Sequence, residues 1–182
     1  MTISSSSKMN LHLILPVLSE LNFIDEKSII IPTNYLQISL DCLKNNFMCQ
    51  YALLSCVSGV DLMQTTYRFA VVYDLLSLVY NARIRIKVFT DGIGSVSSAC
   101  NIYPCANWWE REIWDMFGIY FNNHPDLRRI LTDYGFEGYP LCKNFPLSGF
   151  VEVRYDEIHK RVITEPVVLT QEYRTFKFMS PW

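Results

Sequence analysis

The segment from Asn107 to Leu131 carries the side chains of this sequence that could do chemistry together. Carboxylates, arginines and one histidine stand among its aromatic residues: Glu110, Arg111, Glu112, Asp115, His124, Arg128 and Arg129. Carboxylates and histidines are common proton-transfer groups in enzymes. One hypothesis is therefore a stand-alone enzyme that uses the region of Glu110, Glu112 and His124.

Spacing along a helix weakens that hypothesis. Asn107 and Glu110 match a capping box, and Gly118 is a typical helix end. Together they predict a helix over residues 107–117. Glu110 and Glu112 would point about 200° apart around its axis, so they could not act on one substrate atom. We favour the alternative, that both are structural carboxylates in an interface helix.

The predicted helix is apolar on most sides, so its charges need partners. Arg111 and Asp115 are four residues apart and would share a face. An ionised carboxylate beside apolar surface needs a charged or hydrogen-bonding partner. We expect such partners from Arg128 and Arg129, which follow a turn at residues 124–126, or from another chain.

Patterns for other kinds of chemistry are weak or missing. The six cysteines show neither a CxxC pair nor a zinc-finger or ferredoxin spacing, which is typical of scattered reduced thiols. The seven glycines form neither of the common nucleotide-binding loops. His124 lies in a predicted turn without evident metal-ligand companions, and Ser148 is not in a nucleophile elbow. We expect no catalytic residue, metal ligand or cofactor in this chain.

Composition favours a protein that works in an assembly. Charged residues make up 19% of the 182 residues, below the roughly 25% of ordinary soluble domains, and aromatic residues make up 14%. A large aromatic core would explain this equally well. The net charge of −2 gives no electrostatic footprint for nucleic acid. No apolar run reaches the roughly 18 residues of a membrane span.

The remaining patterns predict an α+β fold. Besides residues 107–117, the expected helices cover residues 10–21, 34–45 and 95–102, and the expected strands cover residues 29–31, 51–60, 67–79 and 83–89. In the second helix Asn34 is the expected cap, and leucines form an apolar stripe at residues 36, 40 and 43. We expect a mostly antiparallel sheet packed by helices.

The strand over residues 83–89 has the clearest pattern. Apolar Ile84, Ile86 and Val88 alternate with three cations, Arg83, Arg85 and Lys87. One face should lie in the core and the other should present the cations. A solvated face is the more common explanation of such a row, and a binding site is the alternative. A nucleic-acid-binding module that uses these cations is disfavoured by the overall charge.

After Leu131 the sequence becomes rich in turn-forming residues. We predict a body over residues 1–138, which includes the helix over 107–117, and an extended tail over residues 139–182. The tail has recurring prolines but stays rich in Phe, Tyr and Val. A disordered segment would have few aromatic residues, so we expect this tail to wrap a partner.

The charged segment resembles a known signature. Its elements are Glu110-Arg111-Glu112, Asp115-Met116-Phe117, His124, Arg128 and Ile130-Leu131. In this spacing they resemble the family of subunit 9 of mitochondrial respiratory complex I and its bacterial counterpart. The resemblance continues through residues 127–138, 145–149 and 151–155, and through the closing Ser-Pro-Trp. It is strongest to the mitochondrion-encoded form.

The resemblance implies a cofactor-free structural and assembly subunit of the peripheral arm of proton-pumping NADH:ubiquinone oxidoreductase. Iron–sulfur clusters and FMN would belong to partner subunits, and activity would exist only in the complex. The chief partner would be the large subunit that shapes the quinone site. The implied location is the matrix side of the mitochondrial inner membrane, as a peripheral subunit. The implied interface residues are Glu110, Arg111, Glu112, Asp115, His124, Arg128, Arg129 and Arg154.

One departure from the family pattern concerns a charge pair. The family usually has Arg and Asp where this chain has Cys142 and Asn144. Loss of both partners of a pair can be nearly neutral, whereas loss of one is costly. We therefore expect an altered local contact with fold and assembly intact.

Overall fold

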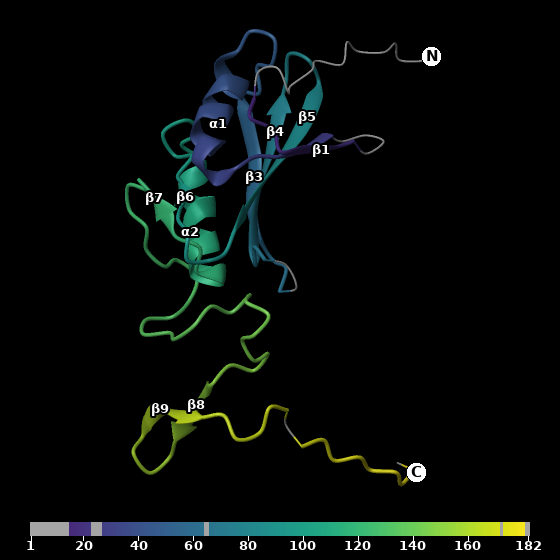
Figure 1. Cartoon of the computed structure of the whole chain (residues 1–182). Helices are drawn as coiled ribbons and strands as arrows, with labels where there is room; N and C mark the ends of the chain where they lie inside the picture. Colours follow the sequence, from purple (N-terminus) through teal and green to yellow (C-terminus); the bar gives the residue numbers. More distant parts are fainter. Residues whose placement is uncertain (1–14, 23–26, 64–65, 172, 181–182) are drawn as a thin grey trace. The chain divides into compact units, whose positions relative to one another are not determined.

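The computed structural model describes residues 15–22, 27–63, 66–171 and 173–180 (Figure 1). The chain divides into two compact units, residues 1–142 and 143–182. This division falls four residues after the expected end of the body at residue 138. The last residues of the first unit pack on a helix, since the Leu141 N–H donates to the Met116 carbonyl oxygen at 3.1 Å.

The first unit is built on a five-stranded sheet with the strand order β1-β2-β5-β4-β3. The strands are β1 (Ser19–Asn22), β2 (Lys27–Ile30), β3 (Leu53–Asp61), β4 (Phe69–Ser77) and β5 (Ala82–Thr90). The β2–β5 pair is parallel and the other three neighbouring pairs are antiparallel. The predicted α+β class with a mostly antiparallel sheet is confirmed.

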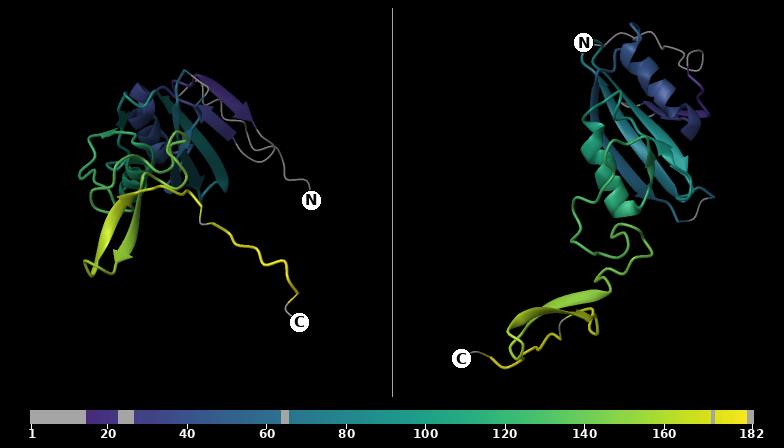
Figure 2. Two further views of the ribbon diagram at one scale, coloured as in Figure 1. Left: turned by 90° about the horizontal axis from the view of Figure 1, so that it is seen from below. Right: turned by 90° about the vertical axis from the view of Figure 1, so that its left-hand side faces the viewer.

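Two helices cover one face of this sheet (Figures 1 and 2). They are α1 (Leu36–Asn45), preceded by a short 3-10 turn at Thr33–Tyr35, and α2 (Ala106–Phe117). The predicted stripe of Leu36, Leu40 and Leu43 is fully buried. Ile86 of β5 is also fully buried, as the alternation in that strand predicts. The core therefore lies between the helices and this face.

Two predicted helices are wrong. Part of the first, residues 10–14, lies outside the described residues, and its end, Ser19–Asn22, is strand β1, paired with β2. The helix over 95–102 is instead the short strand β6 (Val96–Ser97) followed by turns. β6 pairs in parallel with β7 (Phe121–Asn122). In both cases the pairing partner is a separate strand, whose position the local apolar spacing does not reveal.

Both predicted helix caps are also wrong. Asn34 lies inside the 3-10 turn, and Tyr35 takes the cap position of α1 without a side-chain hydrogen bond. Cys105 takes the cap position of α2, also without one. The Glu110 side chain, which the capping box required at the helix start, is fully buried and bonded elsewhere.

The second unit contains a hairpin that the sequence patterns did not predict. Strands β8 (Val151–Asp156) and β9 (Arg161–Pro166) pair antiparallel. Arg154 of β8 forms a two-pronged ion pair with Glu165 of β9, with both N···O distances at 2.8 Å. Most side chains of β8 and β9 are exposed, apolar ones included. This unit has little core of its own.

No helix among the described residues is long and apolar enough to cross a membrane.

Candidate functional site

Helix α2 buries three of its charged residues, while two of its tryptophans are exposed. Its buried residues include three charged ones, Glu110, Arg111 and Asp115. Trp108 is 65% exposed and Trp109 is 36% exposed. Burying charges while exposing large aromatic rings is unusual. The local explanation is that each buried charge holds a segment of the same chain.

Glu110 anchors the loop that precedes α2. Its Oε2 accepts a hydrogen bond from the Ser98 hydroxyl at 2.6 Å, and its Oε1 accepts one from the Ala99 N–H at 2.7 Å. The Cys100 thiol donates to Oε2 at 3.3 Å. Burial raises the pKa of Glu110, although these hydrogen bonds act in the opposite direction. The hydrogen-bond partners of Glu110 are thus residues 98–100 of its own chain, and not Arg128 or Arg129 as expected.

His124 packs against the same group. Its side chain is fully buried, and its Nε2 lies 3.3 Å from the Asn107 carbonyl oxygen and 3.8 Å from Glu110 Oε2. The Asp126 N–H donates to His124 Nδ1 at 3.1 Å. Because Nδ1 accepts, Nε2 is the nitrogen that carries the proton and donates to Asn107.

Asp115 holds the segment that follows the His124 turn. Its Oδ2 accepts three backbone N–H bonds, from residues 130, 131 and 132, at 3.2, 2.7 and 2.9 Å. The Thr132 hydroxyl donates to Oδ1 at 2.6 Å, and Arg129 Nη1 lies 3.6 Å from that oxygen. Burial acts to raise the pKa of Asp115, but the hydrogen bonds outweigh it and the pKa lies below its usual value.

Arg111 and Arg129 also bind the segment that follows the His124 turn. Arg111 Nε donates to the Arg128 carbonyl oxygen at 3.2 Å, and its guanidinium lies over the Trp108 ring. Arg129 donates to the Gly138 carbonyl oxygen at 3.0 Å and lies over the Tyr139 ring. Arg111 and Asp115, which share a face by spacing, form no ion pair with each other among the described residues, because each side chain is directed to the segment after the turn.

The other predicted site residues lie apart from this cluster. Glu112 is half-buried and is not among the contacts of Glu110 or His124. The Arg128 side chain is largely exposed and pairs with exposed Asp126 at 3.0 Å. Arg154 belongs to the second unit. The structure therefore gathers Glu110, Arg111, Asp115, His124 and Arg129 around α2 and leaves these three outside.

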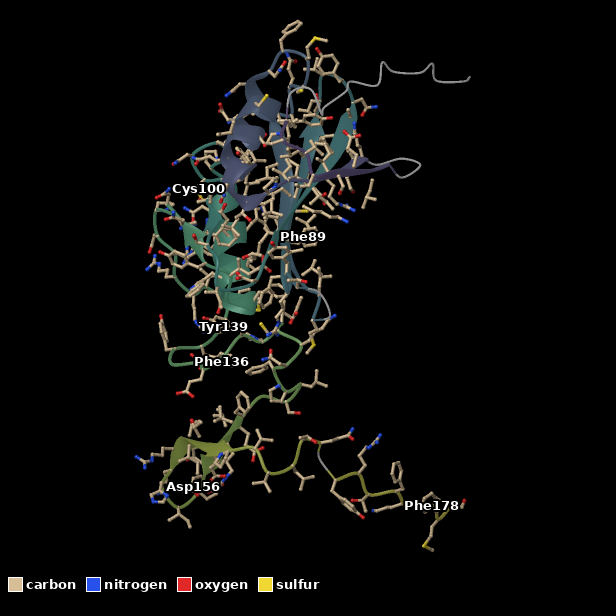
Figure 3. The ribbon with its side chains drawn as sticks, in the orientation of Figure 1. Phe89, Cys100, Phe136, Tyr139, Asp156 and Phe178 are labelled. Carbon is tan, nitrogen blue, oxygen red and sulfur yellow. The ribbon has the colours of Figure 1, made fainter. Side chains whose placement is uncertain are left out.

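One group could in principle hold a metal ion. The potential ligand atoms of Cys100, Glu110 and His124 all lie within 4.8 Å of one another (Cys100 is labelled in Figure 3). Ligation by His124 Nε2 would require the ring proton to move to Nδ1, which already faces the Asp126 N–H. The group is better explained as a hydrogen-bonded core. No sequence spacing would have found it, because its members come from three separate segments.

Cys142 lies at the C-terminal end of α2. It is buried, and its thiol donates to the Phe117 carbonyl oxygen at 3.3 Å. Burial raises the pKa of this thiol. A helix end leaves carbonyl groups without partners inside the helix, and Cys142 satisfies one of them. Cys142 thus serves as a local cap of α2.

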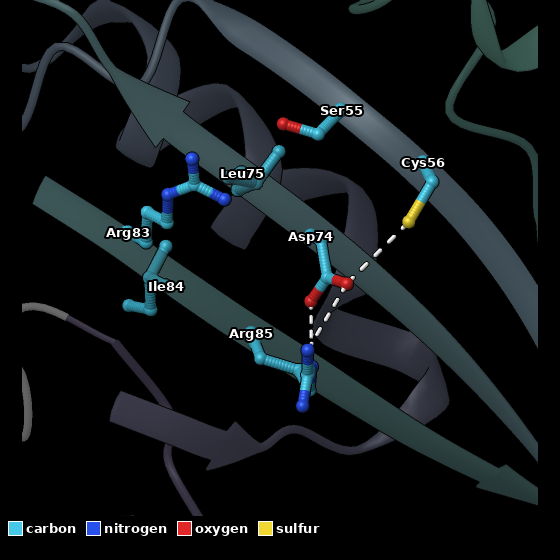
Figure 4. Close-up of a pocket in the computed structure, with 7 residues that line it drawn as sticks. All are labelled: Ser55, Cys56, Asp74, Leu75, Arg83, Ile84 and Arg85. Atoms are coloured by element: carbon cyan, nitrogen blue, oxygen red, sulfur yellow. Dashed lines mark hydrogen bonds and ion pairs between the residues drawn. The ribbon is translucent and has the colours of Figure 1, made fainter. Parts of the chain in front are cut away.

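A shallow pocket of about 160 Å³ lies on the sheet, lined from β3, β4 and β5 (Figure 4). Its lining residues are Ser55, Cys56, Asp74, Leu75, Arg83, Ile84 and Arg85. Arg85 Nε lies 2.6 Å from Asp74 Oδ1, so one cation of the predicted row is paired. The Cys56 thiol donates to the same carboxylate at 3.4 Å.

Residues 29–151 match the model of one protein family, described as "Respiratory-chain NADH dehydrogenase, 30 Kd subunit". The chain belongs to this family. The match covers all of the helix-and-turn cluster around α2 and most of the sheet. The resemblance seen in the charged segment is thereby confirmed.

Three relatives share more than half of their aligned residues with this 30 Kd family member. It is 54% identical to "NADH-ubiquinone oxidoreductase subunit 9" of Reclinomonas americana, over 83% of this chain and 74% of that protein. It is 55% identical to "NADH dehydrogenase [ubiquinone] iron-sulfur protein 3" of Arabidopsis thaliana, over 82% and 79%. It is 59% identical to an NADH-quinone oxidoreductase subunit of Rhizobium etli, over 79% and 72%.

A solved structure shares the fold of this family member. It is a chain of the membrane-bound sulfane sulfur reductase, an archaeal respiratory membrane complex, with a TM-score of 0.64 and 22% sequence identity. The alignment covers 75% of this chain and 81% of that one. At this identity the similarity shows a common fold.

Proposed function

We propose that this subunit of NADH:ubiquinone oxidoreductase is a cofactor-free structural component of the peripheral arm. It braces the subunits that carry the iron–sulfur relay and the quinone site, chiefly the large quinone-site subunit. NADH-to-ubiquinone electron transfer and proton translocation then require the whole complex. Its place is the matrix side of the mitochondrial inner membrane, as a peripheral subunit.

The observation that carries this proposal is the use of the signature charges. Glu110 and Asp115, the buried carboxylates of α2, bind loops of their own chain with short hydrogen bonds. Groups that are fully engaged in holding loops are suited to shaping a surface and poorly suited to binding substrate. Trp108 and Trp109, at the start of α2, are exposed and fit contact with another subunit.

The same observation weighs against a stand-alone enzyme in the region of Glu110, Glu112 and His124. Glu110 and His124 are fully buried side chains, and Glu112 is not among their contacts. The described pocket is lined by other residues. A relative is named as an iron–sulfur protein, yet the one potential ligand group among the described residues contains a single cysteine. We therefore keep the proposal that iron–sulfur clusters and FMN belong to partner subunits.

Truncation tests the structural role. A chain that ends after Phe150 lacks the β8–β9 hairpin and the segment beyond it, while the first unit stays complete. We expect the peripheral arm to fail to assemble in mitochondria that carry this chain, measured by native gel electrophoresis and by NADH–ubiquinone activity. The matched control is Glu157→Ala, a substitution in the hairpin turn that keeps the hairpin. Normal assembly and activity of the truncated form would overturn the proposal that the tail wraps a partner.

A further inference from the structure

The second face of the five-stranded sheet carries a row of cations. Arg83, Arg85 and Lys87 alternate with buried core residues that face the helices, so all three belong to the opposite face of the sheet. Their cross-strand neighbours on β4 are Leu76, Asp74 and Val72. Asp74 is the acidic residue of β4 and pairs with Arg85 through a 2.6 Å contact.

Two of the three cations have no acidic partner within the described ranges. Arg83 is exposed and lines the pocket beside Arg85, and Lys87 is partly exposed. Neither side chain forms an ion pair with any residue that the structure describes. The row therefore keeps a local excess of positive charge on a chain whose net charge is −2. A positively charged patch on a chain with negative net charge attracts and orients a negatively charged partner.

Apolar residues lie beside two of these cations. Leu76 of β4 is the cross-strand neighbour of Arg83, and buried Val72 is the neighbour of Lys87. Ile30 lies beside Lys87 in the β2–β5 register. A mixture of apolar side chains and arginines is typical of the centre of protein interfaces. A face intended only for solvent would have more polar neighbours at these positions.

We propose that this face docks an acidic segment of a neighbouring subunit, with a carboxylate of that segment seated against Arg83 in the pocket. This inference rests on the proposed function as a subunit of the complex. Asp74 lies in the same pocket and pairs with Arg85, so Arg83 is the cation of the pocket that is left for a bound anion. The pocket of about 160 Å³ is also suited to a single side chain. One available cation in a small pocket favours a single protein carboxylate over the many phosphates that a nucleic-acid strand or a lipid surface presents.

Chemical cross-linking in the intact complex provides the first test. A water-soluble carbodiimide joins a lysine amine to a carboxylate that is in direct contact with it. We expect mass spectrometry to find Lys87 joined to an Asp or Glu of another subunit. Lys87→Arg keeps the charge but removes the amine, so this link should disappear while assembly stays normal. A Lys87 link only to carboxylates of its own chain, or Lys87 freely modified in the complex by an amine reagent, would overturn the proposal.

Charge substitution at Arg83 provides the second test. Arg83 is exposed, so Arg83→Lys, Arg83→Gln and Arg83→Glu should all leave the fold intact, as circular dichroism can verify. We expect retention of the subunit in the complex at raised salt to fall in that order, with Arg83→Glu about tenfold weaker.

Two outcomes would overturn the docking face. If the three Arg83 variants are retained equally in an assembled complex, the docking proposal is wrong. The proposed structural role of the subunit is not affected by this result. Lipid vesicles supply the other comparison, because an anionic headgroup offers the alternative source of negative charge. The second outcome is that the full chain binds anionic but not neutral vesicles and loses this binding in Arg83→Glu. If retention in the complex is unchanged in the same variant, the face binds lipid.

Discussion

Asp115 shows how one buried carboxylate can position a long loop. It accepts four hydrogen bonds from a segment about sixteen residues further along the chain. Charge-assisted hydrogen bonds are shorter and stronger than neutral ones, and three of these four are shorter than 3 Å. The Asp115 side chain of α2 therefore positions the segment after the His124 turn.

The lowered pKa of Asp115 predicts a pH-dependent stability. A carboxyl group whose pKa is lower in the folded state stabilises the fold fully above its unfolded value, near pH 3.8, and loses this contribution as the pH falls through the folded pKa. We expect Asp115→Asn to reduce the free energy of unfolding by about 2 kcal/mol at pH 7. The difference from the wild type should shrink as the pH falls below 3.8, as measured by urea unfolding of the full chain.

Asp126→Asn is the matched control for this prediction. The Asp126 carboxylate is largely exposed and pairs with exposed Arg128. Exposed ion pairs contribute little to stability, so its effect should stay below about 1 kcal/mol. A loss of stability in Asp115→Asn that is the same at strongly acidic and at neutral pH would contradict the assigned role of the charge.

At the scale of elements, the packing of α2 on β3 depends on a close approach at one glycine. A Cβ atom added at Gly59 would lie 2.7 Å from Cδ2 of Phe117, the last residue of α2. Real Cβ contacts are not that short. The last turn of α2, with its left-handed cap at Gly118 (φ 78°), can therefore lie against the strand only where the strand has no side chain.

We expect Gly59→Ala to destabilise the first unit by about 1–3 kcal/mol, because the Phe117 ring must shift away from the strand. Thermal unfolding measures the effect. In Gly59→Ala/Phe117→Ala the clash is removed, so the double variant should be no less stable than Phe117→Ala alone. Ser58→Ala, at the exposed neighbouring position of β3, should change stability little. If the losses of stability in Gly59→Ala and Phe117→Ala simply add in the double variant, the close contact between Gly59 and Phe117 is ruled out.

At the scale of the molecule, the two units differ in how they are stabilised. The first unit buries the helix stripe, the β5 core face and the charged cluster of α2. The second unit exposes large apolar side chains, among them Phe176, Phe178 and Met179 (Figure 3). Exposed apolar surface on this scale marks an interaction site. This agrees with the predicted partner-wrapping role, which stays a prediction.

We expect trypsin to cut the isolated chain first in the second unit, at Lys160 or Arg161 beside the hairpin turn. A segment with few buried contacts opens locally at low cost, so cleavage there should be at least about tenfold faster than in the first unit. Arg128 is an internal control, because it is exposed but its segment is tied to Asp115. In the assembled complex the hairpin should be protected. Equal cleavage of both units in the isolated chain would count against the division.

Local patterns determined the parts of this protein that depend on neighbours in the sequence. The alternation of residues 83–89 was sufficient to predict β5, and the leucine stripe was sufficient to predict α1, because burial follows the period of each element. The signature around Glu110 was sufficient to identify the family. The helix ending at Gly118 was also correct, because a left-handed cap is a local requirement.

The partners of the buried charged side chains were decided by the tertiary structure. Glu110 was expected at a helix cap and Asp115 beside Arg111, since spacing shows only which residues can meet along one helix. In the fold, Glu110 reaches Ser98 and Asp115 reaches the segment at residues 130–132. A buried carboxylate accepts hydrogen bonds from whichever donors the fold brings within about 3 Å, and those donors lie on other elements. Strand β6 depended on β7, which lies more than twenty residues away, and strand β1 depended on pairing with the next strand, β2. Apolar spacing inside each segment does not show such pairing, so both segments were predicted as helices.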